Sequence, residues 1–248
     1  MISDIQTIKG KARNLVVAST PRMTVATAIY LTISFILSFL SMRLSGFSSD
    51  EVYNRLMVYY GNGQVEQAAE YLASITPGAF QQIAAALLLV TQLIVEAGYT
   101  IFIMNSVRRT APAYGNLLDG FSITFRVLVL SLIRYFAVGF GLFLFVIPGI
   151  ILLYAYRMSL YLLIDHPEMS VFKCLKESRK MMKGHKLELF RLDFSFLLLM
   201  LLSLIPLIGT ITQIFALPYR FASYVLYYDE LCGKNDEVPE LPEFPGSI

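Results

Sequence analysis

Long apolar blocks follow one another along the chain and limit its possible folds more than any other feature. A helix needs roughly 20 mostly apolar residues to cross about 30 Å of hydrocarbon. Six blocks reach or approach that length, at residues 24–44, 80–104, 121–147, 149–164, 190–208 and 211–228. The fourth and the sixth are shorter or more polar than the others. The pattern predicts an all-α, polytopic transmembrane helical bundle of about six spans.

The composition supports this interpretation, because 56% of the 248 residues are hydrophobic and only 15% are charged. A soluble domain typically carries about 25% charged residues, which keep its large surface wet. A lipid bilayer is the only environment large enough to bury the apolar excess. The formal net charge of +2 gives no indication of a nucleic-acid partner. Membrane lipids are therefore the first expected partners.

Lysine and arginine are distributed unevenly among the segments that connect the apolar blocks. Most of them precede the first block, follow the second or follow the fourth: Lys9, Lys11, Arg13, Arg22, Arg108, Arg109, Lys173, Lys176, Arg179, Lys180, Lys183 and Lys186. These three segments lie on one side of a six-span bundle, so we expect both termini in the cytoplasm. The first block is too long for a cleavable signal peptide and is expected to remain as an anchor. Cys174 and Cys232 fall on the same reducing side, and we expect two structural thiols and no disulfide.

We expect residues 1–232 to form a single integral membrane domain. Residues 47–79 form the one sizeable segment on the opposite side, and glycines within it predict a helical hairpin with helices near 51–60 and 64–75. This hairpin is expected to lie along the outer membrane surface, either as a connector or as a lid over a ligand site. Residues 233–248 are acidic and contain prolines, which is typical of a disordered tail.

A second helix outside the spans is expected on the cytoplasmic side, at residues 167–184. Pro167 suits a first-turn position, and Gly184 suits the residue just past the helix end. One face is apolar and the other is basic, so the helix is expected to lie among lipid headgroups. The candidate headgroup contacts are Lys173, Lys176, Lys180, Lys183 and Lys186.

Ionisable groups inside spans are costly in hydrocarbon and therefore mark candidate functional residues. The deep candidates are one carboxylate, three guanidinium groups and two neighbouring tyrosines: Glu96, Arg134, Arg157, Arg220, Tyr156 and Tyr219. Glu96 lies at a depth similar to Arg157 and Arg220, which predicts an intramembrane ion pair that fixes helix register. The excess of positive charge favours a cavity for an anionic or zwitterionic amphiphile instead. A proton relay through Glu96 is a third interpretation.

Signatures of known catalytic centres are missing from the sequence. There is no His-Glu-x-x-His helix, Gly-x-Ser-x-Gly elbow, P-loop or glycine-rich dinucleotide turn. His166 and His185 have no second histidine or cysteine at metal-ligand spacing. We therefore expect no catalytic residues, no metal and no cofactor, and a protein that is not an enzyme.

Several stretches along almost the whole chain resemble one known family. They are Ile8-Lys9, Ala12-Arg13, Leu15, Gly98-Tyr99, Leu117-Leu118-Asp119-Gly120-Phe121, Pro148-Gly149, Tyr156, Asp165-His166-Pro167-Glu168-Met169-Ser170, Ser178-Arg179-Lys180-Met181-Met182-Lys183-Gly184-His185-Lys186, Phe190, Leu192-Asp193, Ser195-Phe196, Pro218-Tyr219, and Tyr228 through Leu231. The chain thereby resembles the bacterial integral membrane family known as domain of unknown function 975. It departs from that family in having no tryptophan after the Ser-Phe pair. The resemblance implies a multi-pass protein of a bacterial plasma membrane, without an established activity.

Three classes of function remain open from the sequence. The first is binding or transport of an anionic or amphipathic small molecule, lipid or peptide by a non-enzymatic bundle. The second is an accessory or scaffold subunit that works with another membrane protein, such as an exporter partner or an immunity or stress factor. The third is an intramembrane enzyme. A cavity that reaches the buried arginines would favour the first class.

Overall fold

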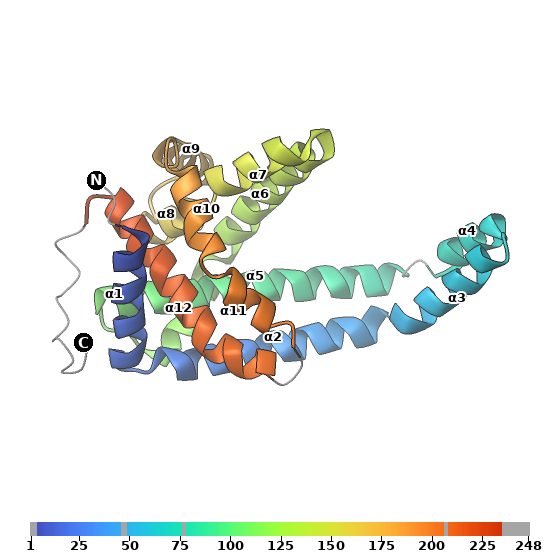
Figure 1. The fold of residues 1–248 in the computed structure, drawn as a ribbon, viewed down its shortest axis with the longest axis horizontal. Coiled ribbons are helices and arrows are strands. Elements are labelled where there is room, and N and C mark those ends of the chain that lie inside the picture. Colours follow the sequence, from blue (N-terminus) through green and yellow to red (C-terminus); the bar gives the residue numbers. More distant parts are fainter. Residues whose placement is uncertain (1–3, 46–48, 76–77, 206–207, 235–248) are drawn as a thin grey trace. The chain divides into compact units, whose positions relative to one another are not determined.

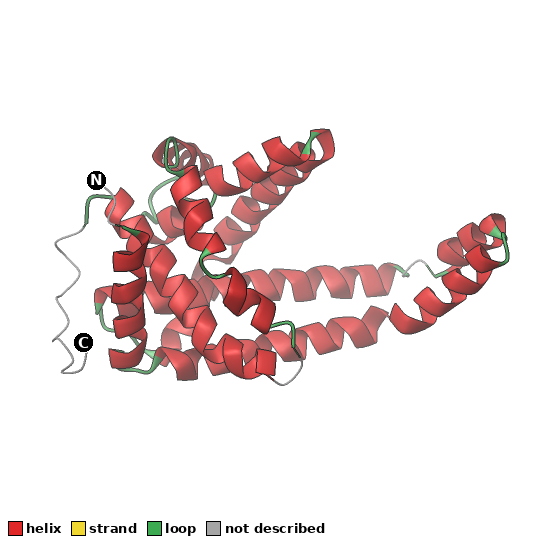
Figure 2. Cartoon of the chain, in the orientation of Figure 1, coloured by secondary structure: helices red, strands yellow, loops and turns green. Residues whose placement is uncertain are grey.

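The computed structural model describes residues 4–45, 49–75, 78–205 and 208–234, and every regular element within them is a helix (Figure 2). The all-α fold class predicted from the sequence is confirmed. The predicted disordered tail, residues 233–248, lies outside the described residues except for its first two positions.

The helices follow one another with short connections (Figure 1). In chain order they are α1 (Ile5–Ala18), α2 (Met23–Ser45), α3 (Ser49–Gly61), α4 (Val65–Ser74), α5 (Ala79–Arg108), the 3-10 helix η1 (Tyr114–Ile123), α6 (Thr124–Leu144), α7 (Val146–Ala155), α8 (Ser159–Asp165), α9 (Val171–Met181), α10 (Lys186–Phe194), α11 (Leu197–Leu202) and α12 (Ile208–Leu231).

Four segments in the described part of the chain are long and apolar enough to cross a membrane. They are Met23–Leu44, Ala79–Arg108, Tyr114–Leu144 and Val146–Asp165, and they match the first four predicted spans. The last two predicted spans do not meet the same criteria. The fifth, 190–208, is divided between α10 and the six-residue α11, and its charged residues lie in α10. The sixth lies in α12, which is continuous but contains Pro218 and Arg220.

The chain divides into two compact units, and the boundary between them falls inside α2 and α5. The first unit contains residues Met1–Leu31 and Leu93–Ile248, and the second contains Thr32–Gln92. In the second unit α3 packs against α4. The bounds of these two helices agree closely with those predicted for the hairpin, 51–60 and 64–75. Arg55 forms an ion pair with Glu51 at 3.1 Å, and Tyr59 contacts Tyr71 with ring centroids 5.9 Å apart.

The core of the first unit is built largely from helix pairs. α1 packs along α12, α6 packs against α7, and α8 packs against α9 (Figure 1). Ile8, Ala12 and Leu15 are the buried side chains of α1. Their spacing of four and three residues places them on one helical face, which explains why this short, polar helix folds against α12.

Two glycines allow η1 to approach α5 closely. A Cβ atom added to Gly98 would lie 2.0 Å from the carbonyl oxygen of Leu117, and one added to Gly120 would lie 2.2 Å from that of Ile94. No side chain fits in this space. The contact brings the loop after α5 back onto the helix and thereby fixes where the next span begins.

Candidate functional site

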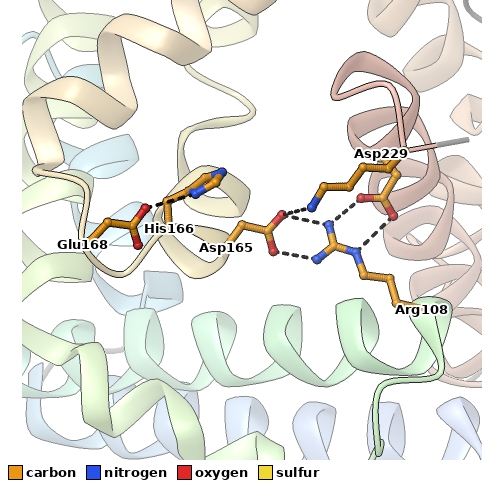
Figure 3. Close-up of polar contacts among 6 residues, drawn as sticks. Arg108, Asp165, His166, Glu168 and Asp229 are labelled. Atoms are coloured by element: carbon orange, nitrogen blue, oxygen red, sulfur yellow. Dashed lines mark hydrogen bonds and ion pairs between the residues drawn. The ribbon is translucent and has the colours of Figure 1, made fainter. Parts of the chain in front are cut away.

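A guanidinium group at the end of α5 joins three helix ends. Arg108 donates two hydrogen bonds to Asp165 at the end of α8, at 2.6 and 2.9 Å. It also donates two to Asp229 in the last turn of α12, one of them from Nε at 3.2 Å. Lys234 Nζ donates to the Asp165 carboxylate at 3.3 Å. Figure 3 shows the guanidinium between the two carboxylates.

This Arg108 network is largely removed from solvent. The side chains of Arg108, Asp165 and Asp229 are 18%, 10% and 2% exposed. Buried charges are tolerated when they are paired and their hydrogen bonds are satisfied, as they are here. The Arg108 guanidinium also lies 5.9 Å from the ring centroid of Tyr228. The network therefore fixes the relative positions of α5, α8 and α12.

The Arg108 network was not predicted as a site from the sequence, where Arg108 served only as a mark of orientation. A usable signal was present nonetheless. Asp165 and Asp229 each follow directly after an apolar block, and Arg108 lies four residues beyond the end of another. In a six-span bundle all three block ends lie on the same side, so a positive charge faces two negative ones at one level.

A second polar cluster lies among α7, α8, α10 and α12. Asp193 accepts a hydrogen bond from the Tyr154 hydroxyl at 2.9 Å and another from the Tyr224 hydroxyl. The Arg157 guanidinium lies over the Tyr224 ring, 4.7 Å from its centroid. Tyr161 on α8 is close enough to interact electrostatically with Arg157. The Tyr224 ring therefore stabilises this arginine through a cation–π contact.

Glu96 and Arg220 lie near this cluster but form no ion pair. Both interact electrostatically with Tyr161. Among the described residues, however, no carboxylate lies within ion-pair distance of Arg157 or Arg220, and Glu96 has no such partner. The Nε atom of Arg220 is buried and has no hydrogen-bond partner in the described part of the chain. In the described part of the chain the ion pair expected for Glu96 is therefore not formed, and the carboxylate that acts electrostatically on Arg157 is Asp193.

The other three predicted site residues lie apart from the cluster. The Arg134 guanidinium is placed over the ring of its neighbour Tyr135, at 5.3 Å. Tyr156 packs at the margin of the hydrophobic core. Tyr219 contacts Phe196 edge to face, with centroids 5.0 Å apart. The tyrosines beside Arg157 are thus Tyr161 and Tyr224, and the predicted pair Tyr156 and Tyr219 has other neighbours.

A mostly apolar groove runs between α1, α11 and α12, and we call it the α1–α12 groove. Its volume is about 350 Å³, and it is lined by Arg13, Val16, Val17, Leu199, Thr212, Phe215, Ala216 and Tyr219. Arg13 is its only charged lining residue and is exposed. It interacts electrostatically with Tyr219 and has no ion-pair partner among the described residues.

The amphipathic helix after α8 is shorter than predicted. α9 covers Val171–Met181, and the Ser170 hydroxyl caps it by accepting from the Lys173 backbone N–H at 3.4 Å. Pro167 was expected in the first turn but precedes the helix, because the Ser170 cap begins it three residues later. Gly184 has φ +91° past the helix end, as its position predicted.

The two faces of α9 differ as expected. Cys174, Leu175 and Ser178 are buried, and the Ser178 hydroxyl donates to the Ala155 carbonyl at 2.9 Å. Burial raises the pKa of the Cys174 thiol, which agrees with a structural role. The lysines on the other face, Lys173, Lys176 and Lys180, are exposed. The other two predicted headgroup contacts lie beyond α9: Lys183 is exposed, and Lys186, at the start of α10, is partly buried.

The two histidines each contact a nearby glutamate. His166 Nδ1 lies 3.2 Å from Glu168 (Figure 3) and His185 Nδ1 lies 2.9 Å from Glu188. The described residues contain no group of three histidine, cysteine, aspartate or glutamate side chains that could hold a metal ion. A backbone hydrogen bond, with a smaller contribution from His166, lowers the pKa of Glu168.

Comparison with known proteins finds a family match over part of the chain. Residues 137–235 match the family model described as protein of unknown function (DUF975). The matched segment begins within α6 and extends past α12. It therefore contains the polar cluster around Asp193 and both carboxylates of the Arg108 network. No curated protein matches the chain, and no solved structure does.

Proposed function

We propose that this chain, which its residues 137–235 assign to the DUF975 family, is a non-enzymatic integral membrane protein that binds an anionic amphiphile. Four helices of suitable length and apolarity agree with a membrane location. The observation that carries the proposal is the α1–α12 groove, whose walls are mostly apolar and whose single charged residue is Arg13.

The shape and the lining of the groove select the class of ligand. A volume of about 350 Å³ is within the range of small-molecule sites. Val16, Leu199 and Phe215 offer apolar contact to a hydrocarbon chain. The Arg13 guanidinium can donate two parallel hydrogen bonds to a carboxylate or a phosphate. One acyl chain with one anionic head satisfies both parts of the lining.

The charge of the groove lining supports the same ligand class. Arg13 is the only charged residue in that lining and is a cation, and it has no ion-pair partner among the described residues. A neutral or cationic amphiphile would gain nothing from this charge, whereas an anionic one is attracted by it.

The test compares two ligands that share an oleoyl chain. Equilibrium dialysis of the full chain in a neutral detergent measures binding of radiolabelled oleate, which is anionic, and of monoolein, which is neutral. We expect oleate to bind more tightly to the native protein. In Arg13→Gln this preference is lost, because the head group loses its charged donor. Lys11→Gln is the matched control, since Lys11 is exposed on α1 and does not line the groove.

A second variant tests the apolar part of the groove. Ala216 lines it, and Ala216→Phe places a ring in the space that the acyl chain would occupy. Binding of both oleate and monoolein should weaken in this variant. Equal affinity for oleate in the native protein, Arg13→Gln and Ala216→Phe would contradict the proposal.

A further inference from the structure

A second pocket lies where α1 ends, α2 begins and α5 ends. Its volume is about 460 Å³, and its polar lining consists of Ser19, Thr20, Ser106 and Arg109. None of its lining residues is acidic. We call it the Ser106 pocket. Leu15 and Ala18 of α1 line the Ser106 pocket, whereas Arg13, Val16 and Val17 of α1 line the α1–α12 groove. The two sites therefore share no α1 residue.

The hydroxyl of Ser106 is buried without a partner. Ser106 is 5% exposed, and its Oγ atom has no hydrogen-bond partner in the described part of the chain. Other hydroxyls of the same helix behave differently, because Thr91 and Thr100 donate to the backbone carbonyl four residues earlier. A buried polar group left unpaired is costly and calls for a ligand or a water molecule. Ser106 lines the pocket, so its partner would be found there.

Two further donors line the same space. The Arg109 guanidinium is exposed and has no ion pair with a described residue, and the Thr20 hydroxyl is exposed as well. The Ser19 hydroxyl is already engaged, since it accepts from the Met23 N–H at 3.0 Å and donates to the Val16 carbonyl at 3.2 Å. The hydrogen bond from the Met23 N–H caps the start of α2. The positive end of the α2 dipole adds to the attraction of an anion.

We propose that the Ser106 pocket binds a phosphate group, either as inorganic phosphate or as the headgroup of an anionic phospholipid. A phosphate offers several acceptor oxygens, which can receive hydrogen bonds from Ser106, Thr20 and Arg109 together. The pocket is larger than one phosphate, so a glycerol moiety also fits. Arg108 ends, and Arg109 follows, a helix that is long and apolar enough to cross a membrane, which agrees with a pocket at the level of lipid headgroups.

The experiment uses the full chain in a neutral detergent and follows its melting temperature. One arm titrates inorganic phosphate. A second arm titrates dioctanoyl phosphatidylglycerol, and a third titrates dioctanoylglycerol, which has the same chains and no phosphate. We expect phosphatidylglycerol, or inorganic phosphate, to raise the melting temperature in a saturable way. Dioctanoylglycerol should leave the melting temperature unchanged. The arm that responds identifies the source of the phosphate group.

Two variants locate the binding. Ser106→Ala and Arg109→Gln should each weaken the affinity about tenfold or more, because each removes a donor to a charged acceptor. Ser106→Ala is expected to fold, since it removes an unpartnered hydroxyl and introduces the best helix former. Arg22→Gln is the control, because Arg22 is exposed beside the start of α2 and does not line the pocket. Its affinity should stay within about twofold of the native value.

The outcomes separate this inference from the proposed function. No response to inorganic phosphate or to phosphatidylglycerol overturns it, and so does an affinity that Ser106→Ala and Arg109→Gln leave unchanged. A response to dioctanoylglycerol equal to that of phosphatidylglycerol overturns it too, because binding would then depend on the chains. Arg13→Gln should leave phosphate binding intact, so either site can fail while the other stands.

Discussion

Replacing Arg108 by glutamine tests the Arg108 network most directly. The change removes the four hydrogen bonds that the guanidinium donates to Asp165 and Asp229. Lys234 still reaches Asp165 at 3.3 Å. Asp229 keeps no ion-pair partner among the described residues and interacts with Lys234 only at longer range, although its side chain is only 2% exposed. The variant therefore leaves a buried carboxylate without its ion pair and without the hydrogen bonds from Arg108.

The magnitude follows from this burial. Removing one member of a buried ion pair typically costs about 3–5 kcal/mol, and we expect Arg108→Gln to lower the free energy of unfolding by that amount. Asp229→Asn should cost less, about 1–2 kcal/mol, because Arg108 keeps both bonds to Asp165. In the double variant the unpaired charge at 229 is gone. It should therefore be more stable than Arg108→Gln alone.

The assay is reversible unfolding in mixed micelles of a neutral detergent and sodium dodecyl sulphate, followed by far-ultraviolet circular dichroism. The double-mutant cycle then gives the coupling between positions 108 and 229, for which we expect at least about 1 kcal/mol. Arg179→Gln is the control, since Arg179 is exposed on α9. If Arg108→Gln is as stable as Arg179→Gln, or if the two changes at the network simply add, the network is not a stabilising contact.

Two further predictions concern packing and orientation. Gly98→Ala should destabilise the protein by about 1–3 kcal/mol or more, because its Cβ would lie 2.0 Å from the Leu117 carbonyl oxygen. Gly10→Ala, where a Cβ meets nothing within 4 Å, should be neutral or stabilising, and thermal unfolding compares the two. In a cysteine-free background, Lys183→Cys should react with a membrane-impermeant maleimide only after the cells are opened; labelling of intact cells would contradict cytoplasmic placement.

The helices were predictable because their signals are local. An apolar run of spanning length indicates a transmembrane helix with little dependence on the rest of the chain. The helices of the hairpin, α3 and α4, were predictable for a similar reason, because glycines and a proline mark their ends. The division of the fifth predicted span into α10 and α11 was not predictable in this way, since its sequence is apolar at one end and charged at the other.

The pairing of buried charges was predicted less well, because depth alone was used. Equal depth places Glu96 level with Arg157, but it does not say which way either side chain points around its helix. Each residue turns the direction by about 100°, so a partner at the right depth can face another neighbour. Asp193 shows the converse case. It was not among the predicted site residues, yet it accepts hydrogen bonds from Tyr154 and Tyr224.

The Arg108 network also restricts how many times the chain can cross a membrane. Asp165 ends α8, Asp229 lies in the last turn of α12, and both bind the residue that ends α5. These three helix ends therefore lie at one level and on one side. Between the ends of α5 and α8 lie two segments that are long and apolar enough to cross a membrane, Tyr114–Leu144 and Val146–Asp165, and two crossings return the chain to the side on which it began. Between the ends of α8 and α12 it must cross an even number of times, so α10 to α12 either span the membrane twice or return without crossing. In both cases the ends of α5, α8 and α12 share one side, and an odd number of crossings between any two of these ends is inconsistent with the network.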